Sequence, residues 1–368
     1  MNLCLRNLLL ALCLAAAIAA STRTVAAEPP LPPPHHVHLF PPVRTGLRNA
    51  TPPVNLQYYG GPVIHAGTMY LIYWLPPGFF MSPAYQTLIN RYFTDVGATP
   101  LFNIVTQYPD GSGPPLNAST LGGTWVDTAS YPRAGTTADP LLDSDIGAEV
   151  LHAIATHPGW NPPGPNTAYF VFTARDVHSC IDASKTACFL SEYCAYHGSF
   201  VSGGVTVLYN NMPDAGTNLS GCSVGTGPNG DPEADAEISL ISHEHFEVVT
   251  DPQPNVATAW SDVDGFEIAD KCAYTYGALN ADNSNVVLHG HPYRVQQEWS
   301  NLISACTLSL PSSVGGISEP TGLTRPSPGR LTGSPVRARG TRETDAVVAA
   351  LTLVVGIAWA KRPRSDKR

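Results

Sequence analysis

Apolar residues in this chain fall into short continuous runs and into longer stretches with helical spacing. Continuous runs are typical of buried strands, whereas apolar positions repeated every three to four residues predict a helix with one buried face. On this basis we expect strands over 69–75, 101–108, 167–174 and 203–211, and helices over 82–98 and 141–157. An insert that contains cysteines, at 178–200, separates the last two strands.

A further helix is expected after residue 231 because both of its ends are marked. Asp231 can cap the free N–H groups of the first turn, Pro232 suits the first helical position, and Glu233 is an acid near the positive end of the helix. Pro252 ends the helix, since the residue before a proline avoids the α conformation. The alternation of strands and helices predicts an α/β layered domain with a mixed sheet over 55–310.

Composition and charge narrow the class of protein. The chain has 368 residues, of which 35 are proline, 32 are glycine and only 13% are charged. These values favour a globular protein rich in loops over a coiled coil or helical repeat. Residues 55–310 carry six Lys or Arg and 24 Asp or Glu, a net charge of −18. An acidic body argues against nucleic acid as a partner and is compatible with bound cations.

The two ends of the chain predict export and anchoring. Residues 1–27 combine a basic start, an apolar run and a small-residue cleavage site, which is typical of a secretory signal peptide. Residues 28–54 are rich in proline and are expected to form a disordered leader that carries His35, His36 and His38. Residues 311–344 are expected to be a linker, and 345–368 hold an apolar run at 346–360 before a basic tail. This run predicts a membrane anchor or a sorting signal, although fifteen residues are short for a span.

Six cysteines remain after removal of the signal peptide, which is typical of three disulfides in an exported chain. The absence of a C-x-x-C pair from the sequence argues against a cysteine zinc site. Six cysteines allow fifteen pairings. Nearness along the chain favours Cys180–Cys188, Cys194–Cys222 and Cys272–Cys306.

The stretch "HEHFE" at 243–247 lies one residue from the zinc motif H-E-x-x-H. His243 and Glu247 are one turn apart on the predicted helix, so both can face one metal ion. Glu267 follows after a loop and is the expected third ligand, with Glu244 as the catalytic base toward a metal-bound water. The expected cofactor is Zn²⁺, although two anionic ligands also suit another divalent cation.

This arrangement resembles thermolysin-like zinc peptidases, in which a glutamate at a similar separation is the third ligand. The resemblance implies that Asp270 supports the histidine ligand from outside the coordination shell, and that the fold is a zincin-like layered domain. Because the second ligand is Glu247 rather than histidine, the spacing predicts metal binding more strongly than hydrolysis. Asp262 and Asp264 are alternative third ligands, and His245 is expected to point away from the metal.

Three other patterns have weaker support. His289 and His291 share one side of a strand and could form a second metal site, although a surface role is the default. The string "GCSVG" at 221–225 fits the serine-hydrolase elbow, and "GTGPNG" at 225–230 fits a dinucleotide-binding loop. Both patterns require a strand directly before them, and the sequence places loop there.

A set of longer motifs resembles the EXORDIUM family, also called phosphate-induced proteins. The motifs occur in the family's order over about 58–306: "GGPVIHAGTMYLIYW", "SEYCAYHGSF", "SHEHFEVVTDP", "AWSDVDGFEIADKCAYTYG" and "VQQEWSN". The resemblance implies a secreted protein with H-E-x-x-E as its usual motif and no established catalytic activity. The leader and the basic tail depart from the plant members, which are associated with growth responses, and favour a microbial envelope protein.

Two classes of function therefore stay open. One is a secreted or surface-anchored metallohydrolase that resembles a metallopeptidase and acts on peptides. The other is a non-enzymatic extracellular binding or signalling protein, whose metal, if any, is structural. Either would have an unidentified peptide or cell-envelope ligand as its partner.

Overall fold

Residues 37–43, 54–223 and 225–311 are described by the computed structural model of this chain. The predicted signal peptide, the linker beyond residue 311 and the apolar run 346–360 lie outside the described residues. The described residues belong to one folded unit, which lies within 1–312. Within these ranges, no helix combines the length and the apolar character needed to cross a membrane.

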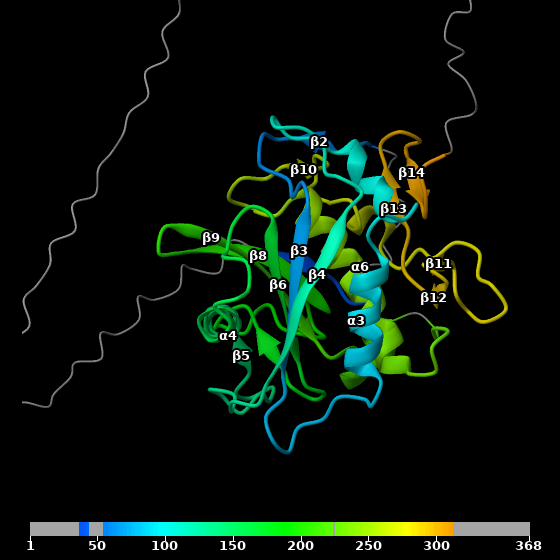
Figure 1. Cartoon of the computed structure of the whole chain (residues 1–368). Helices are drawn as coiled ribbons and strands as arrows, with labels where there is room; N and C mark the ends of the chain where they lie inside the picture. Colours follow the sequence, from blue (N-terminus) through cyan, green and yellow to red (C-terminus); the bar gives the residue numbers. More distant parts are fainter. Residues whose placement is uncertain (1–36, 44–53, 224, 312–368) are drawn as a thin grey trace, which may run out of the picture. The chain divides into compact units, whose positions relative to one another are not determined.

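A six-stranded sheet in the order β1-β8-β9-β6-β3-β4 forms the middle layer of this unit (Figure 1). Pairing is parallel within β4-β3-β6-β9, whereas β8 runs antiparallel to both β9 and β1. The predicted mixed sheet is therefore confirmed. Its strands are β1 (Val37–Phe40), β3 (Gly67–Trp74), β4 (Ser119–Asp127), β6 (Thr167–Thr173), β8 (Ala195–Ser202) and β9 (Val205–Pro213).

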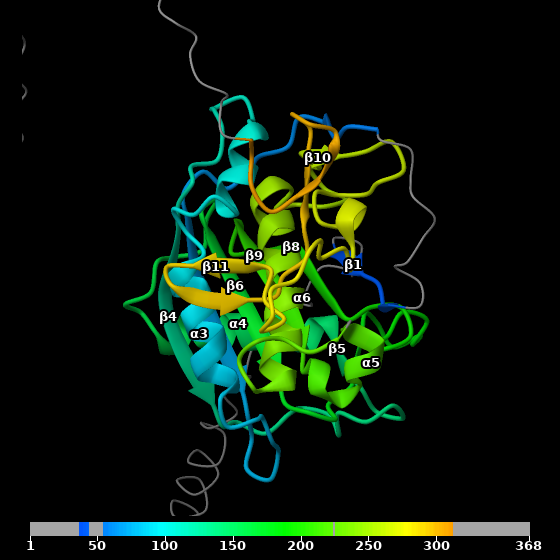
Figure 2. The ribbon, with the colours of Figure 1, turned by 90° about the vertical axis from the view of Figure 1, so that its right-hand side faces the viewer.

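Three long helices cover the two faces of the sheet: α3 (Tyr85–Asp95), α4 (Asp143–Thr156) and α6 (Pro232–Thr250). The chain passes from β3 through α3 to β4, and then moves back across the sheet through α4 to β6. Right-handed crossovers in opposite directions place α3 and α4 on opposite faces. Helix α6 contacts α3, β8 and β9, so α6 lies in the same layer as α3 (Figure 2).

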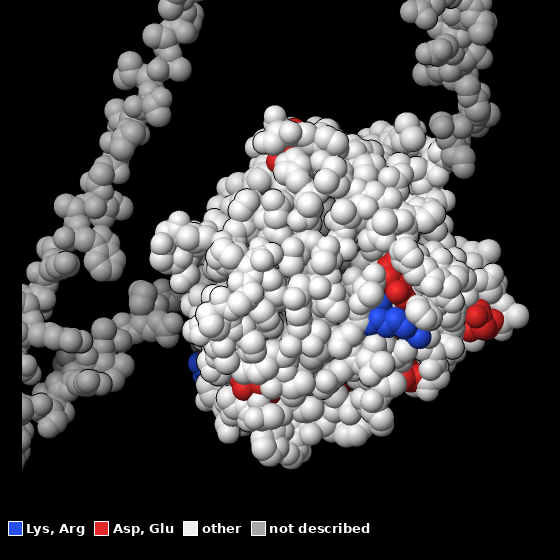
Figure 3. All heavy atoms as spheres, viewed as in Figure 1, with Lys and Arg blue, Asp and Glu red and all other residues white. Residues whose placement is uncertain are grey.

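Short elements surround this framework. Two-stranded pairs are formed by β2 (Gln57–Tyr58) with β10 (Trp260–Ser261), β5 (Leu141–Leu142) with β7 (Ser179–Cys180), β11 (Val286–Leu288) with β12 (His291–Tyr293), and β13 (Glu298–Ser300) with β14 (Ala305–Thr307). The short helices are α5 (Leu219–Cys222) and the 3-10 turns η1 (Phe102–Gln107), η2 (Ala215–Thr217) and η3 (Asp270–Cys272). On the face shown in Figure 3, Lys and Arg atoms cover only small areas.

Helix α6 has the ends that the sequence predicts. The Asp231 side chain accepts a hydrogen bond from the Ala234 N–H at 3.2 Å, and Pro232 is in the first turn. The helix ends at Thr250, two residues before Pro252. Its residues from Ala234 to Thr250 are all buried, so polar groups on α6 must find partners inside the protein.

Two expectations from the sequence, for residues 101–108 and for the leader, are wrong. The strand expected over 101–108 is instead the turn η1, where the Phe102 N–H donates to the Thr99 hydroxyl at 3.1 Å. Its apolar residues are buried and η1 contacts α6, so the apolar run reflects burial and not a strand. The predicted disorder of the leader 28–54 is wrong for Val37–Phe40, because these residues form β1 and pair with β8.

The three disulfides pair as expected: Cys180–Cys188, Cys194–Cys222 and Cys272–Cys306. Three disulfides are typical of a protein that folds in an oxidising, extracellular environment. The last of them ties η3, which follows the loop that contains Glu267, to β14. This covalent tie restricts the position of that loop beside α6.

A buried acidic pair lies beside the first half of α6. Asp214 Oδ1 accepts from the Gly216 N–H at 2.7 Å, whereas Asp214 Oδ2 has no hydrogen-bond partner in the described structure. Burial outweighs this hydrogen bond and raises the pKa of Asp214 to about 7, with Glu233 adding to the shift. Glu237, which accepts from the Ala215 N–H, also has its pKa raised well above the usual range by burial and by Asp214.

We predict that Asp214→Asn stabilises the protein at pH 8 and has little effect at pH 4. The folded-state pKa of Asp214 is above its unfolded value, so ionisation of this carboxyl group is harder in the folded protein. The wild type therefore loses stability as pH rises between these two values, and the neutral asparagine does not. At about 1.4 kcal/mol per pKa unit, the gain at pH 8 is between about 1 and 4 kcal/mol. Urea unfolding at both pH values measures this gain, and an equal effect at pH 4 and pH 8 would contradict the prediction.

Candidate metal centre

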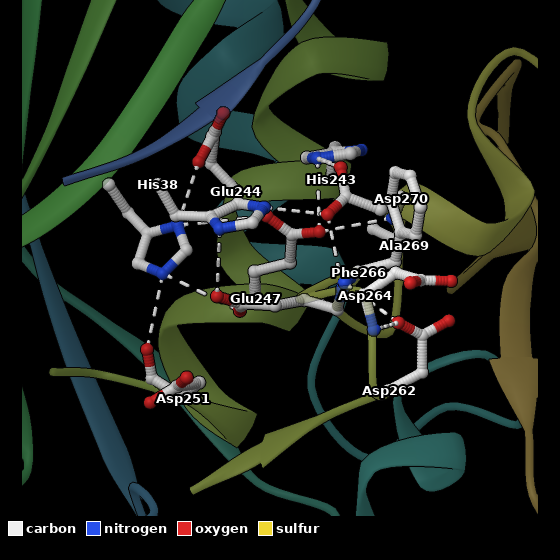
Figure 4. A network of polar contacts seen from close by, with 12 residues as sticks. His38, His243, Glu244, Glu247, Asp251, Asp262, Asp264, Phe266, Ala269 and Asp270 are labelled. Carbon is white, nitrogen blue, oxygen red and sulfur yellow. Dashed lines mark hydrogen bonds and ion pairs between the residues drawn. The ribbon is translucent and has the colours of Figure 1, made fainter. Parts of the chain in front are cut away.

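The motif residues lie on a fully buried part of α6. His243, Glu244 and Glu247 are each 0% exposed. His243 Nε2 lies 3.1 Å from Glu247 Oε1, one helical turn away (Figure 4). The predicted helix therefore presents both side chains to one site.

The loop after β10 adds two carboxyl groups to this site. The Glu267 N–H donates to Asp270 Oδ2 at 3.0 Å, and the Asp270 N–H donates to Glu247 Oε1 at 3.1 Å. Asp270 Oδ1 also lies 3.6 Å from His243 Nε2. The structure thus brings together all five residues that the sequence singles out, namely His243, Glu244, Glu247, Glu267 and Asp270.

Two histidines outside the predicted ligand set complete the cluster: His38, which the sequence places in a solvated leader, and His197, which sequence reasoning missed. His38 of β1 and His197 of β8 are directly opposite each other in the strand register. His38 Nε2 donates to Asp270 Oδ2 at 2.6 Å, and His38 Nδ1 lies 3.2 Å from Glu267 Oε1. His197 Nδ1 lies 3.1 Å from Glu244 Oε2 and 3.7 Å from Glu247 Oε2, and its Nε2 is 3.6 Å from Glu267 Oε2.

A local signal in the sequence could have located His197. Gly203 and Gly204, between "HGSFVS" and "VTVLYN", have the form of a two-residue hairpin turn. The observed hairpin of β8 and β9 has this turn, and both glycines have positive φ. Recognising the hairpin would have placed His197 on the strand beside β9. His38 has only the short alternation of "HVHLF", inside a segment rich in proline.

The electrostatics of the cluster are dominated by buried acids. Burial, followed by Glu247, raises the pKa of Glu244 well above the usual range, and burial with Asp251 does the same for Glu267. Burial lowers the pKa of His38, but Asp270 outweighs it and raises that pKa to about 9. Burial would raise the pKa of Asp270, yet His38 lowers it to about 2. His38 and Asp270 are therefore a charged pair beside several acids that are costly to ionise.

Unsatisfied atoms converge on the same place. Among the described residues, several buried polar atoms of the cluster have no hydrogen-bond partner: Glu244 Oε1, Glu247 Oε2, Asp251 Oδ2, Glu267 Oε2 and His243 Nε2. A buried carboxylate oxygen without a partner is costly, and a bound cation removes that cost. The donor set, carboxylate oxygen with imidazole nitrogen, is one that zinc and other divalent cations accept. The residues present therefore fit a divalent cation.

The hydrogen bonds distinguish the histidines on α6 and β8. The Gln296 amide donates to His243 Nδ1 at 2.9 Å and to the Ala269 carbonyl at 3.0 Å. His243 Nδ1 is then an acceptor, so its proton is on Nε2, toward Glu247. His197 has the opposite tautomer. Its Nε2 carries the proton and donates to the Asp251 carbonyl at 3.1 Å, so its Nδ1 keeps a lone pair. A metal-binding histidine ordinarily donates its other N–H to such a carbonyl.

Two groups in the cluster offer three ligand atoms within 4.8 Å of one another: His38 with Glu247 and Asp270, and His197 with Glu247 and Glu267. Glu247 belongs to both groups and His243 to neither. The predicted ligand set of His243, Glu247 and Glu267 stays a prediction. The structure places its members in one cluster in which His197 offers the better imidazole ligand.

Neither alternative third ligand joins the two groups of ligand atoms among the described residues, and Asp264 is exposed. Asp262 pairs with Lys271 at 2.9 Å and accepts from the N–H groups of Asp264 and Phe266, so it organises the loop. His245 lies on another side of α6, where its Nε2 is 2.9 Å from the Ser119 hydroxyl. Its ring contacts Phe93 and Phe102 at centroid distances of 5.3 and 5.2 Å.

The residues of the motifs with weaker support do not gather at a common site among the described residues. His291 Nδ1 is 2.6 Å from Asp95 Oδ2, and His289 Nε2 is 3.1 Å from the Gly97 carbonyl. Ser223 follows the short helix α5, and Cys222 beside it is in a disulfide, so the elbow geometry is not formed. The glycine-rich string at 225–230 lies between α5 and α6 and does not follow a strand.

Comparison with known proteins gives no independent identification. No family model, no curated protein and no solved structure matches this chain.

Proposed function

We propose that this chain is an exported metalloprotein with a closed divalent-cation centre around Glu247. The main support is a set of buried carboxyl oxygens, on Glu244, Glu247 and Glu267, that have no hydrogen-bond partner among the described residues. These three carboxyl groups surround His197 between α6, β8 and the loop after β10. We expect His197, Glu247 and Glu267 to hold the cation, because their ligand atoms lie within 4.8 Å of one another. Zinc is the expected ion, and the anionic ligands would also accept a harder divalent cation.

The burial of the centre supports a structural role for the cation. A catalytic zinc site keeps one position open to solvent, whereas a structural site is closed by protein ligands. Here the motif residues are fully buried, and the His38 side chain, 18% exposed, covers the Asp270 side of the cluster. Phe40 of the same strand stacks on the His243 ring at a centroid distance of 3.6 Å. Strand β1 thus covers the centre.

This closed centre favours the binding or signalling function over hydrolysis, with a peptide or cell-envelope component as the ligand. The mixed sheet followed by the motif helix supports a zincin-like domain that has kept the layout of a hydrolase. The apolar run at 346–360 would anchor the protein to a membrane. The resemblance to EXORDIUM proteins, which implies a secreted protein without established activity, is consistent with this proposal.

The second candidate function is a peptide hydrolase, favoured by the position of Glu244. Glu244 lies beside Glu247 and His197 with Oε1 unpartnered, and burial raises its pKa, so it could hold and release a proton. A divalent cation would supply Lewis acidity to such a reaction. Displacement of β1 would be required for a substrate to reach these groups.

We predict that protein purified without a histidine tag retains a divalent metal ion, and that His197→Gln and Glu247→Gln each lower the metal content by about one ion per chain. Chelation should lower the free energy of unfolding of the wild type, by about 3 to 4 kcal/mol for free metal at 100 to 1,000 times the dissociation constant. Elemental analysis and urea unfolding measure both effects, with Glu192→Gln, at an exposed acid outside the centre, as the matched control for Glu247→Gln. Unchanged metal content in both centre variants would contradict the proposal. His243→Ala tests the ligand set predicted from sequence.

We also predict that neither the wild type nor Glu244→Gln cleaves a broad peptide library. The physical reason is that the centre is buried beneath β1, which keeps a substrate away from the cation. Mass spectrometry of the library after incubation with metal-loaded protein measures cleavage. Cleavage by the wild type that Glu244→Gln abolishes would overturn the structural role and establish the hydrolase.

A further inference from the structure

A second cluster of metal-binding side chains lies where β4 ends beside α4. Asp127 is the last residue of β4, and Glu149 and His152 are three residues apart on α4. His152 Nδ1 lies 3.3 Å from Asp127 Oδ2 and 3.6 Å from Glu149 Oε2. Helix α4 covers the opposite face of the sheet from α6, so this cluster is separate from the Glu247 centre.

Both carboxyl groups of this cluster are buried beside the His152 imidazole. Asp127 is 5% exposed and Glu149 is 4% exposed. Asp127 Oδ1 accepts from the Ala129 N–H at 2.9 Å, but Asp127 Oδ2 and Glu149 Oε1 have no hydrogen-bond partner in the described structure. Of the described lysines and arginines, none forms an ion pair with either group. Two acids are therefore aimed at the same small volume beside one imidazole.

We propose that Asp127, Glu149 and His152 bind a divalent transition-metal cation such as zinc or manganese. One ligand atom from each residue lies within 4.8 Å of the others. Two carboxylate oxygens and one imidazole nitrogen suit zinc or manganese, whereas calcium prefers six or more oxygen ligands. The His152 side chain is 49% exposed, so water could complete the coordination. The Trp125 ring contacts the His152 ring edge-on at 5.3 Å and restricts its orientation.

The rival explanation is a proton shared between the two acids. Burial, followed by Asp127, raises the pKa of Glu149 to about 9, which is the state expected without a cation. In that case Glu149→Gln would replace the shared proton with an amide hydrogen bond and would leave metal binding unchanged. The two explanations therefore differ in metal stoichiometry, which can be measured.

The test is equilibrium dialysis of the full-length, untagged chain against buffered free zinc after chelator treatment, with zinc per chain measured by elemental analysis. We expect His152→Gln and Glu149→Gln each to bind one zinc fewer than the wild type, and Glu192→Gln, at an exposed acid outside the cluster, to bind as the wild type does. His152 is half exposed, so its variant should fold even if Glu149→Gln does not.

The zinc content of the wild type and of His152→Gln separates this site from the Glu247 centre. If the Glu247 centre binds no metal, the wild type binds one zinc and His152→Gln binds none, which still supports the second site. If His152→Gln binds as much zinc as the wild type at every free zinc concentration, the second site is refuted. A Glu149→Gln variant with the melting temperature raised equally with and without zinc would identify the shared proton instead.

Discussion

The structure depends most on how the buried acids around Glu247 are neutralised. Glu244, Glu247, Asp251 and Glu267 are nearly or fully buried, and ionised carboxylates in such a place are costly unless a positive charge compensates them. His38 supplies one compensating charge, to Asp270 and Glu267. The remaining acids must either keep their protons or share a cation, and the unpartnered oxygens that face one another favour the cation.

The fold holds these groups in place from three directions. Helix α6, with an Asp231 cap at one end and Pro252 beyond the other, fixes the spacing of His243 and Glu247. The Cys272–Cys306 disulfide and the hydrogen bond from Asp270 to Glu247 hold the loop beside the helix. The hairpin of β8 and β9 presents His197, and β1 adds His38 on the adjacent strand. The cluster is therefore assembled from four separate segments, each of which is held by its own contacts.

The parts of this site that follow local rules could be predicted from the sequence. The cap, the prolines and the one-turn spacing of the motif are local signals, and they located α6 and its acidic side chains. The disulfides were predictable because cysteines close in the chain can meet without long loops. By contrast, the contribution of β1 depends on pairing across more than 150 residues, and nothing in the leader, which is rich in proline, indicates that pairing. The apolar run of η1 was also ambiguous, because a short run of apolar residues is found both in buried strands and in other buried segments.

Anomalous diffraction at the zinc absorption edge, from crystals grown with metal-loaded protein, would locate the cation and its ligands directly. A cation held by the proposed ligands gives a strong anomalous peak within about 2.0–2.2 Å of a Glu247 carboxylate oxygen and of a His197 ring nitrogen, the distances typical of zinc bound to oxygen and nitrogen. A map with no peak in the cluster, in protein shown to contain zinc, would contradict the proposed centre. A peak held by other residues, with Glu247 outside the coordination shell, would contradict it equally.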